Sequence, residues 1–228
     1  MINKLYPSSQ DAIADIADGS VIMIGGFGPA GQPVELIDAL IEHAPKHLTL
    51  ISNNAGNGDF GLAALLKAGC VDKMICSFPR QSDSWVFDQL YRDKRIELEL
   101  VPQGNLVARI QAAGAGIGAF FTPTGFGTAL TEGKETRVIN GKPYVLEYPL
   151  FADYALIKSH CADRWGNLTF NKAGRNFGPI MASAAKCTIA QTTQLVPLGG
   201  INPEHVITPG IYVTRVVHTP HAQTRLSA

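Results

Sequence analysis

The sequence predicts an α/β fold: an open, mostly parallel sheet flanked by helices, with an antiparallel hairpin inserted near its middle. Short apolar runs typical of buried strands alternate with helical segments of about ten residues, which is the pattern of parallel β-α-β units. Asn140-Gly141 separates the two β-rich runs of segment 136–148 and is typical of a two-residue hairpin turn. No internal repeat is visible. We therefore expect one domain over residues 1–228.

Strand and helix signals follow one another in strict order through the first half of the chain. Ser8 or Ser9 can cap a helix over 10–17, and the apolar run 21–24 predicts a strand. A helix over 33–44 follows, with apolar residues on one face. Up to residue 116 we further predict strands over 48–52, 73–78 and 96–102, and helices over 61–69, from Ser82 or Ser84 to 94, and over 105–116.

The alternation resumes after the predicted hairpin. We predict a strand over 154–159, a helix over 178–186, and strands over 187–191 and 210–217. The carboxyl ends of parallel strands meet at one edge of such a sheet, and ligands of open α/β sheets bind beyond that edge. The loops after the predicted strands are therefore the first place to search for a site.

Composition excludes several classes of protein. With 46% hydrophobic residues, the 228-residue chain can bury a core, so disorder is not expected. Nineteen basic and nineteen acidic residues balance, which gives no net attraction to nucleic acid or to an anionic membrane. No apolar stretch has the length of a secretory leader or a membrane span. The four cysteines show no metal-ligand spacing, which indicates reduced thiols in a cytoplasmic protein without a metal.

The segment IGGFGPAGQP (24–33) contains a literal G-x-G-x-x-G, the fingerprint of dinucleotide-binding loops. In those loops the third glycine lies inside a helix, and the second strand ends in Asp or Glu. Here Pro29 and Pro33 interrupt the region, and strand 48–52 runs into Asn53-Asn54. The context therefore argues against a dinucleotide site and predicts a free loop.

A glycine loop of this kind can bring backbone N–H groups close to a ligand, because glycine adopts conformations that other residues avoid. N–H groups beside a helix start can hold a phosphate, a carboxylate or a developing oxyanion. The alternative is a tight strand-to-helix turn that binds nothing, and spacing alone leaves both interpretations open.

Three loops rich in polar residues, 25–31, 52–58 and 102–105, should meet at the carboxyl edge of the sheet. Their amides can donate and accept hydrogen bonds while staying neutral; they come from Asn53, Asn54, Asn57, Gln103 and Asn105. An internal nucleophile is missing. There is no G-x-S-x-G motif, no cysteine has an evident histidine partner, and Asp59 and Glu132 look like turn and solvent-exposed residues.

These loops carry a resemblance to a known family. Segment 18–33 resembles the glycine signature of the family I CoA-transferases at Asp18-Gly19, at the apolar triplet 22–24, and at 25–27, Gly31 and Pro33. The likeness extends over almost the whole chain and matches the A-type (alpha) subunit or half of that family. The further matching stretches are 52–56, 102–116, 120–128, 166–181 and 203–217. Within the family, segment 77–105 is most similar to the subgroup that acts on 3-oxoadipate.

The resemblance implies that the reactive Glu belongs to a B-type (beta) subunit, so that no catalytic residue is expected in this chain. The active site would lie at the junction of the alpha and beta subunits in a heterodimer or a higher assembly such as α2β2. The glycine loop is implied to bind CoA through Gly25, Gly26, Phe27, Gly28, Pro29, Ala30 and Gly31. Asn53, Asn54 and Gln103 are implied to line the carboxylate and acyl site. CoA thioester would be a substrate, with no permanently bound cofactor.

By the same resemblance the reaction moves CoA from succinyl-CoA to 3-oxoadipate. The partner's Glu attacks the thioester to give an acyl-glutamyl anhydride and CoA thiolate. The thiolate then attacks the glutamyl carbonyl, which leaves an enzyme thioester and releases succinate, and the acceptor carboxylate reverses both steps. Two rivals stay open: a transferase acting on acetoacetate or a short-chain acid, and a binding module without chemistry.

A dicarboxylate acceptor needs a cation for its distal carboxylate. Arg80, inside the stretch most similar to the 3-oxoadipate subgroup, is the first candidate and Arg175 is the second. The alternative for Arg80 is an ordinary surface or ion-paired arginine, and the sequence does not decide between them.

Overall fold

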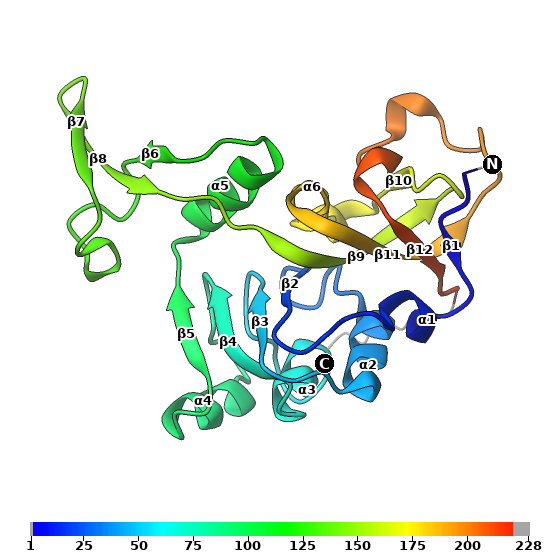
Figure 1. The fold of residues 1–228 in the computed structure, drawn as a ribbon, viewed down its shortest axis with the longest axis horizontal. Coiled ribbons are helices and arrows are strands. Elements are labelled where there is room, and N and C mark those ends of the chain that lie inside the picture. The colour runs from blue at the N-terminus through cyan, green and yellow to red at the C-terminus, as the bar shows by residue number, and fades with distance from the viewer. Residues whose placement is uncertain (1, 221–228) are drawn as a thin grey trace.

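A computed structural model describes residues 2–220 of the chain. One large sheet runs through it in the order β1-β12-β11-β9-β2-β3-β4-β5, with helices on both faces (Figure 1). All neighbours on this path pair in parallel, and only β10 adds an antiparallel strand beside β9. The predicted open, mostly parallel sheet is confirmed.

The strands of the large sheet are short except for the long pair β9 and β11. They are β1 (Leu5–Tyr6), β2 (Val21–Ile24), β3 (Leu48–Ile51), β4 (Val71–Cys76), β5 (Glu97–Leu100), β9 (Ala152–Ala162), β10 (Leu168–Thr169), β11 (Ala185–Leu195) and β12 (Arg215–His218). The helices are α1 (Ser9–Ile13), α2 (Val34–His43), α3 (Leu62–Lys67), α4 (Trp85–Arg92), α5 (Gln103–Gly114) and α6 (Gly178–Ala184). Short 3-10 turns are η1 (Ala129–Thr131), η2 (Lys172–Arg175), η3 (Pro203–His205) and η4 (Gly210–Tyr212).

The core lies in two layers because neighbouring strand residues point to opposite faces of the sheet. Ile22 and Ile24 pack with the apolar faces of α1 to α4, whereas Met23 between them packs with α5 and α6. Both faces of the central strands are therefore buried, which explains why β2 is apolar throughout. Within residues 2–220 no helix has the length and apolar character needed to cross a bilayer.

The strand order reverses direction between β2 and β9. Strands β2 to β5 follow one another toward one edge of the sheet, and β9, β11 and β12 follow one another toward the other. The carboxyl end of β2 thus stands beside Leu156 of β9, at the point where successive connections diverge, and β9 continues beyond it to Ala162. In open α/β sheets such a switch point opens a crevice between the loops.

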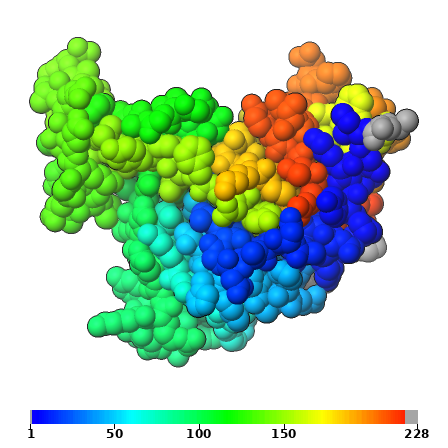
Figure 2. Space-filling model, in the orientation of Figure 1, coloured from blue at the N-terminus to red at the C-terminus, as the bar shows by residue number. Residues whose placement is uncertain are grey.

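The predicted hairpin is confirmed. Asn140 and Gly141 both have positive φ, 51° and 76°, as the turn between β7 (Thr136–Ile139) and β8 (Lys142–Glu147) requires. A third strand, β6 (Phe120–Thr122), pairs with the other side of β8. The resulting three-stranded arm stands away from the main body (Figures 1 and 2).

Buried Glu147 fastens the arm to the main body. Its Oε1 accepts hydrogen bonds from Lys134 Nζ at 2.7 Å and from Asn105 Nδ2 at 3.3 Å. Asn105 lies in the first turn of α5, directly after Gln103 and Gly104. The carboxylate therefore couples the position of the arm to the start of α5.

Some predicted boundaries were wrong. The helix predicted over 10–17 ends at Ile13, and the strand predicted from 210 begins only at Arg215 because residues 210–212 form a 3-10 turn. The N–H of Gly210 donates to Asn167 Oδ1, and a side chain at this position would press against the carbonyl of Trp165. These tertiary contacts, which no local pattern encodes, hold that segment out of the sheet.

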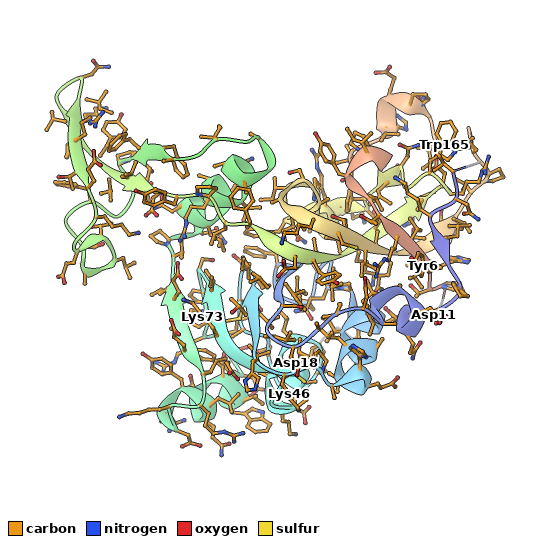
Figure 3. All side chains as sticks on the ribbon, viewed as in Figure 1. Tyr6, Asp11, Asp18, Lys46, Lys73 and Trp165 are labelled. Atoms are coloured by element: carbon orange, nitrogen blue, oxygen red, sulfur yellow. The ribbon has the colours of Figure 1, made fainter. Side chains whose placement is uncertain are left out.

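A bidentate ion pair ties the N-terminal segment to β12. Arg215 Nη1 and Nη2 each lie 2.6 Å from an oxygen of Asp15, and the guanidinium stacks over the ring of Tyr6, labelled in Figure 3, at 5.4 Å. Hydrogen bonding from Arg215 lowers the pKa of Asp15. The pair therefore joins the segment after α1, together with β1, to the C-terminal strand of the sheet.

We predict that Asp15→Asn destabilises the fold by no more than about 1 kcal/mol, because half of the Asp15 side chain is exposed. A carboxyl whose pKa is lowered in the folded state stabilises above its unfolded pKa and loses that effect as pH falls through the folded value. The difference between native protein and variant should thus stay constant above about pH 5 and shrink below about pH 4. Urea unfolding at several pH values measures it. Glu132→Gln, at an exposed carboxyl without an ion pair in the described part, is the control; an equal pH trend in both variants would contradict the assignment.

Candidate active site at the carboxyl edge of the sheet

The glycine loop is a self-contained turn between β2 and α2. Phe27 and Ala30 exchange backbone hydrogen bonds of 3.0 and 3.2 Å, which folds the loop back on itself. Helix α2 starts only at Val34, after Pro33. The free loop predicted from the two prolines is confirmed, and the third glycine does not lie inside a helix.

Most backbone N–H groups of this loop already have acceptors. Gly25 donates to Leu156 O at 3.0 Å, and Gly26 donates to Asn176 Oδ1 at 3.1 Å. Phe27 and Ala30 donate to each other, and Pro29 has no N–H. Within residues 2–220, only the N–H groups of Gly28 and Gly31 in segment 25–31 have no acceptor. The loop can therefore offer a ligand two backbone donors.

Asn176 clamps the loop from the segment that precedes α6. Its Oδ1 accepts from Gly26 N, and its Nδ2 donates to Ala30 O at 2.9 Å and to Ala173 O at 2.7 Å. Gly31 packs directly against this segment: a β-carbon on Gly31 would lie 2.6 Å from the carbonyl oxygen of Gly174. Sequence reasoning missed Asn176 as a functional residue, although it lies inside stretch 166–181 of the resemblance.

A cluster of neutral side chains joins the next three loops. Asn53 follows β3, Ser77 follows β4 and Gln103 starts α5. Asn53 Oδ1 accepts from Gln103 Nε2 at 2.7 Å and from Ser77 Oγ at 2.8 Å. Two donors on one oxygen fix the amide of Asn53, and its Nδ2 has no acceptor within the described residues. Ser77 was absent from the sequence-based candidates.

Two buried amide atoms beside this cluster have no hydrogen-bond partner among the described residues, namely Asn54 Nδ2 and Gln32 Oε1. Asn54 Oδ1 accepts from Gly56 N at 2.9 Å, and Gln32 Nε2 donates to Gly28 O at 3.0 Å. A buried polar atom without a partner costs about 1–3 kcal/mol. Such atoms gather where a protein binds something or moves.

The expected convergence of five amides was wrong for two of them. Asn57 Oδ1 accepts from Asp83 N at 2.9 Å and thereby ties two loops together. Asn105 is buried and turned toward the arm, where it donates to Thr124 O and to Glu147. Each residue of an α-helix turns the chain by about 100°, so Gln103 and Asn105, two positions apart, point to nearly opposite sides of α5.

The two candidate arginines both lie near this edge. Arg80, in the loop after β4, is 62% exposed, and its Nε lies 2.6 Å from Asp88 Oδ1 of α4. Arg175 is exposed in η2, next to Asn176, and has no ion pair within residues 2–220. Arg80 is thus ion-paired with Asp88, as the alternative interpretation expected. Among the described residues only Nε takes part, so Nη1 and Nη2 remain free to bind another group.

No reactive side chain accompanies the amides in the described part of the chain. No carboxylate oxygen there is hydrogen-bonded to Asn53, Asn54, Gln103 or loop 25–31. Burial raises the pKa of the Cys76 thiol to about 12, which keeps it protonated. Burial also raises the pKa of the other free thiols, Cys70, Cys161 and Cys187. Within residues 2–220 no group of three or more His, Cys, Asp or Glu side chains could hold a metal ion.

Two large apolar side chains stand exposed at the same edge. Phe27, in the glycine loop, is 54% exposed and Phe78, after β4, is 59% exposed. Phe78 forms a backbone bridge with Asn54, so it lies beside the amide cluster. Exposed aromatic residues beside a group of polar side chains are typical of a contact surface.

Comparisons with known proteins agree on one family. The family model described as coenzyme A transferase matches residues 6–219. The chain is 68% identical over 217 residues to the A-type subunit of 3-oxoadipate CoA-transferase from Pseudomonas putida, covering 95% of this chain and 94% of that protein. It is 63% identical to the protein of the same name from Acinetobacter baylyi, covering 95% of each.

A solved structure supports the fold. The acyl-CoA transferase of E. coli O157:H7, in a thioester complex with CoA, superposes with a TM-score of 0.85 at 22% identity. The superposition covers 98% of this chain and 48% of the other, so the present chain spans about half the length of that protein.

We predict that Gly31→Ala disrupts the clamp on the loop whereas Gly28→Ala does not. Both glycines have positive φ, 77° and 56°, so alanine strains either position by about 1–2 kcal/mol. Only at Gly31 would the new β-carbon also collide, at 2.6 Å from Gly174 O and 2.7 Å from Asn176 Nδ2; at Gly28 nothing lies within 4 Å. Amide hydrogen exchange at Gly26 should accelerate at least tenfold more in the Gly31 variant, because an opening made easier by about 1.4 kcal/mol exchanges about tenfold faster. Equal exchange in both variants would contradict the proposed contact.

Proposed function

The chain belongs to the coenzyme A transferase family, and we propose that it is the A-type (alpha) subunit of a succinyl-CoA:3-oxoadipate CoA-transferase. The observation that carries this proposal is the 68% identity to the A-type subunit of 3-oxoadipate CoA-transferase over nearly the full length of both chains. The substrates would be succinyl-CoA and 3-oxoadipate, as in the β-ketoadipate pathway of aromatic degradation. The four free thiols fit a reducing compartment such as the cytoplasm.

A B-type (beta) subunit completes the site. The described residues supply neutral amides, a serine and a glycine loop at the carboxyl edge of the sheet, and no carboxylate bonded to them. The exposed Phe27 and Phe78 beside these groups suit burial under another chain. The partner would contribute the nucleophilic Glu, in a heterodimer or an α2β2 assembly.

The neutral character of this half-site suits the reaction. A fixed cation close to the partner's Glu would stabilise its carboxylate and weaken it as a nucleophile. Amides orient a carboxylate or an acyl carbonyl without that effect. Gln103 and Asn53, held together by their hydrogen bond of 2.7 Å, would contact the acyl carbonyl and the carboxylate that leaves or enters. Asn54, with an unsatisfied Nδ2, would gain an acceptor if substrate binding shifts its loop.

The start of helix α5 would also stabilise negative charge at this half-site. The helix begins at Gln103 without a side-chain cap, so its first N–H groups and the positive end of its dipole face the amide cluster. Each tetrahedral intermediate of acyl transfer carries an oxyanion, and one preorganised donor can be worth about 3 kcal/mol to the rate. The glycine loop would hold the CoA thioester through the free N–H groups of Gly28 and Gly31.

The covalent chemistry takes place on the partner's Glu. Its carboxylate attacks the thioester carbonyl of succinyl-CoA, and an acyl-glutamyl anhydride and free CoA thiolate form. The thiolate attacks the glutamyl carbonyl, which produces a glutamyl-CoA thioester and releases succinate. The carboxylate of 3-oxoadipate then attacks this thioester, and the two steps run in reverse to give 3-oxoadipyl-CoA and a free carboxylate.

We predict that this chain alone shows no CoA exchange and that addition of the beta subunit restores it. The test is to purify the chain alone and with a co-expressed beta subunit, and to follow transfer from succinyl-CoA to 3-oxoadipate and to acetoacetate. Mass spectrometry after succinyl-CoA treatment should find the thioester on a Glu of the partner. Transfer by the pure single chain, or a thioester on one of its own acids, would refute the mechanism; preference for acetoacetate would refute the acceptor.

We predict that Arg80→Ala raises the KM for 3-oxoadipate about tenfold, the loss of one charged hydrogen bond, and hardly changes the KM for a monocarboxylate such as acetoacetate. Arg80 follows β4 at the same edge as Ser77, and only its Nε is hydrogen-bonded to Asp88. Asp88→Asn keeps the arginine and frees it, so this variant should retain the preference. Arg175→Ala is the matched test of the second candidate. Equal effects of Arg80→Ala on both acceptors would exclude Arg80 as the specificity residue.

A further inference from the structure

Glu147 is a buried carboxylate that takes no part in the proposed chemistry. It ends β8 in the arm, and its side chain is only 3% exposed. Its Oε1 accepts hydrogen bonds from Lys134 Nζ at 2.7 Å and from Asn105 Nδ2 at 3.3 Å, and its Oε2 lies 3.8 Å from Arg109 Nε. A buried carboxylate needs opposite charge and hydrogen bonds around it. Lys134 and Arg109 supply the opposite charge, so the charge of Glu147 is balanced without Asn105.

The side chain of Asn105, in the first turn of α5, is turned entirely toward the arm. Asn105 is 1% exposed. Its Nδ2 donates to Glu147 Oε1 and, at 3.1 Å, to Thr124 O, while its Oδ1 accepts from Thr122 Oγ1 at 3.4 Å. Within residues 2–220 every hydrogen bond of this side chain therefore leads to the arm. Because hydrogen bonds are directional, these three fix how the first turn of α5 is rotated.

Gln103 begins the same helical turn, but burial does not fix it in place. Gln103 and Gly104 are exposed, and the helix starts without a side-chain cap. Gln103 Nε2 donates to Asn53 Oδ1 at 2.7 Å, and this bond joins α5 to the amide cluster. Helix ends fray unless other contacts hold them. The next two residues, Asn105 and the core residue Leu106, therefore determine where Gln103 stands.

We propose that Glu147 is a positioning residue for CoA transfer: through Asn105 it holds the first turn of α5 so that Gln103 keeps its place in the amide cluster. The inference rests on the proposed function, in which Gln103 contacts the acyl carbonyl. Glu147 itself touches no reacting atom. The three-stranded arm, which stands away from the main body in Figures 1 and 2, then supports the acyl site through this carboxylate.

The test is Glu147→Leu in the assembled complex of the alpha and beta subunits, with kcat and KM measured for transfer from succinyl-CoA to 3-oxoadipate. The kcat should fall about 10- to 100-fold, because a small misplacement of a group at the reacting centre can cost about 100-fold. The KM values should change by about twofold or less, since the lost contact matters mainly in the transition state. Glu147→Gln keeps an acceptor for Asn105 and should hold kcat within about threefold of the native value.

A second variant breaks the same link from the side of α5. Asn105→Ala leaves the ion pair between Glu147 and Lys134 in place, and it should lower kcat as much as Glu147→Leu does. The double variant Glu147→Leu/Asn105→Ala should lose no more than either single variant. Such non-additivity is expected only if Glu147 acts through Asn105, and a purely structural role would not produce it in kcat. If Glu147→Leu does not assemble with the beta subunit, Asn105→Ala still tests the proposal.

A matched control separates this link from the general loss of a carboxylate in the arm. Glu135 lies in the same arm and forms an exposed ion pair with Arg137, 3.1 Å away, without a bond to α5 among the described residues. Glu135→Leu should therefore leave kcat at the native value. Thermal unfolding of each complex shows whether the variants compared are equally folded.

The outcomes decide the proposal in either direction. A native kcat in the assembled Asn105→Ala complex would overturn it, and so would additive losses in the double variant or equal losses in Glu147→Gln and Glu147→Leu. Absence of transfer by the native complex would contradict the proposed function instead. In that case amide hydrogen exchange over residues 103–106 still decides whether Glu147 fixes this turn: it should be at least about tenfold faster in Glu147→Leu than in the native complex.

Discussion

The arrangement depends on one side chain that joins the glycine loop to the segment before α6, at the switch point where β2 pairs with β9. Asn176 precedes α6, yet it hydrogen-bonds Gly26 and Ala30, at the two sides of the glycine loop that follows β2. These bonds add to the loop's own Phe27–Ala30 pair in restricting glycines 25, 26, 28 and 31, since glycine loses more freedom on folding than any other residue. The close approach of Gly31 to Gly174 is possible only because Gly31 lacks a side chain. The conformation of the loop and the position of Asn176 and Gly174 therefore depend on each other.

Internal hydrogen bonds, of which Asn176 accepts the one from Gly26, explain why the loop offers so few free donors. A loop that left all its N–H groups open would need water or ligand at each of them. Here internal partners satisfy Gly25, Gly26, Phe27 and Ala30, and only Gly28 and Gly31 remain available among the described residues of the loop. A rigid loop with two aimed donors binds with less loss of entropy than a mobile loop with many. The amide cluster is held rigid in the same way, because Ser77 and Gln103 both donate to Asn53 Oδ1 and fix its side chain.

The sequence was sufficient for most of the helices and strands and for the mostly parallel character of the sheet, because these depend on local signals. The apolar run 21–24, the helical face of 33–44 and the Asn140-Gly141 turn each encode their own structure, and the structure has all three. It was insufficient for the site in one respect: proximity in sequence to a strand end does not tell where a side chain points. Asn105 lies two residues from Gln103 but faces the arm, because Glu147 and the carbonyl of Thr124 are there to bond it. Asn176 and Ser77 were missed for the converse reason, since their partners are far away in the chain.

The position of the glycine loop beside both the amide cluster and the pocket lined by Lys158 and Lys172 constrains what evolution or design can change. On one side the loop contacts Gln32, whose Nε2 donates to Gly28 O and whose buried Oε1 lies against Gly61 in the loop after β3. On the other side segment 29–31 forms a wall of the lysine-lined pocket. Movement of one wall moves the other, because Asn176 fixes the loop at both sides. A substitution that shifts one side of the loop is therefore expected to shift the other side as well.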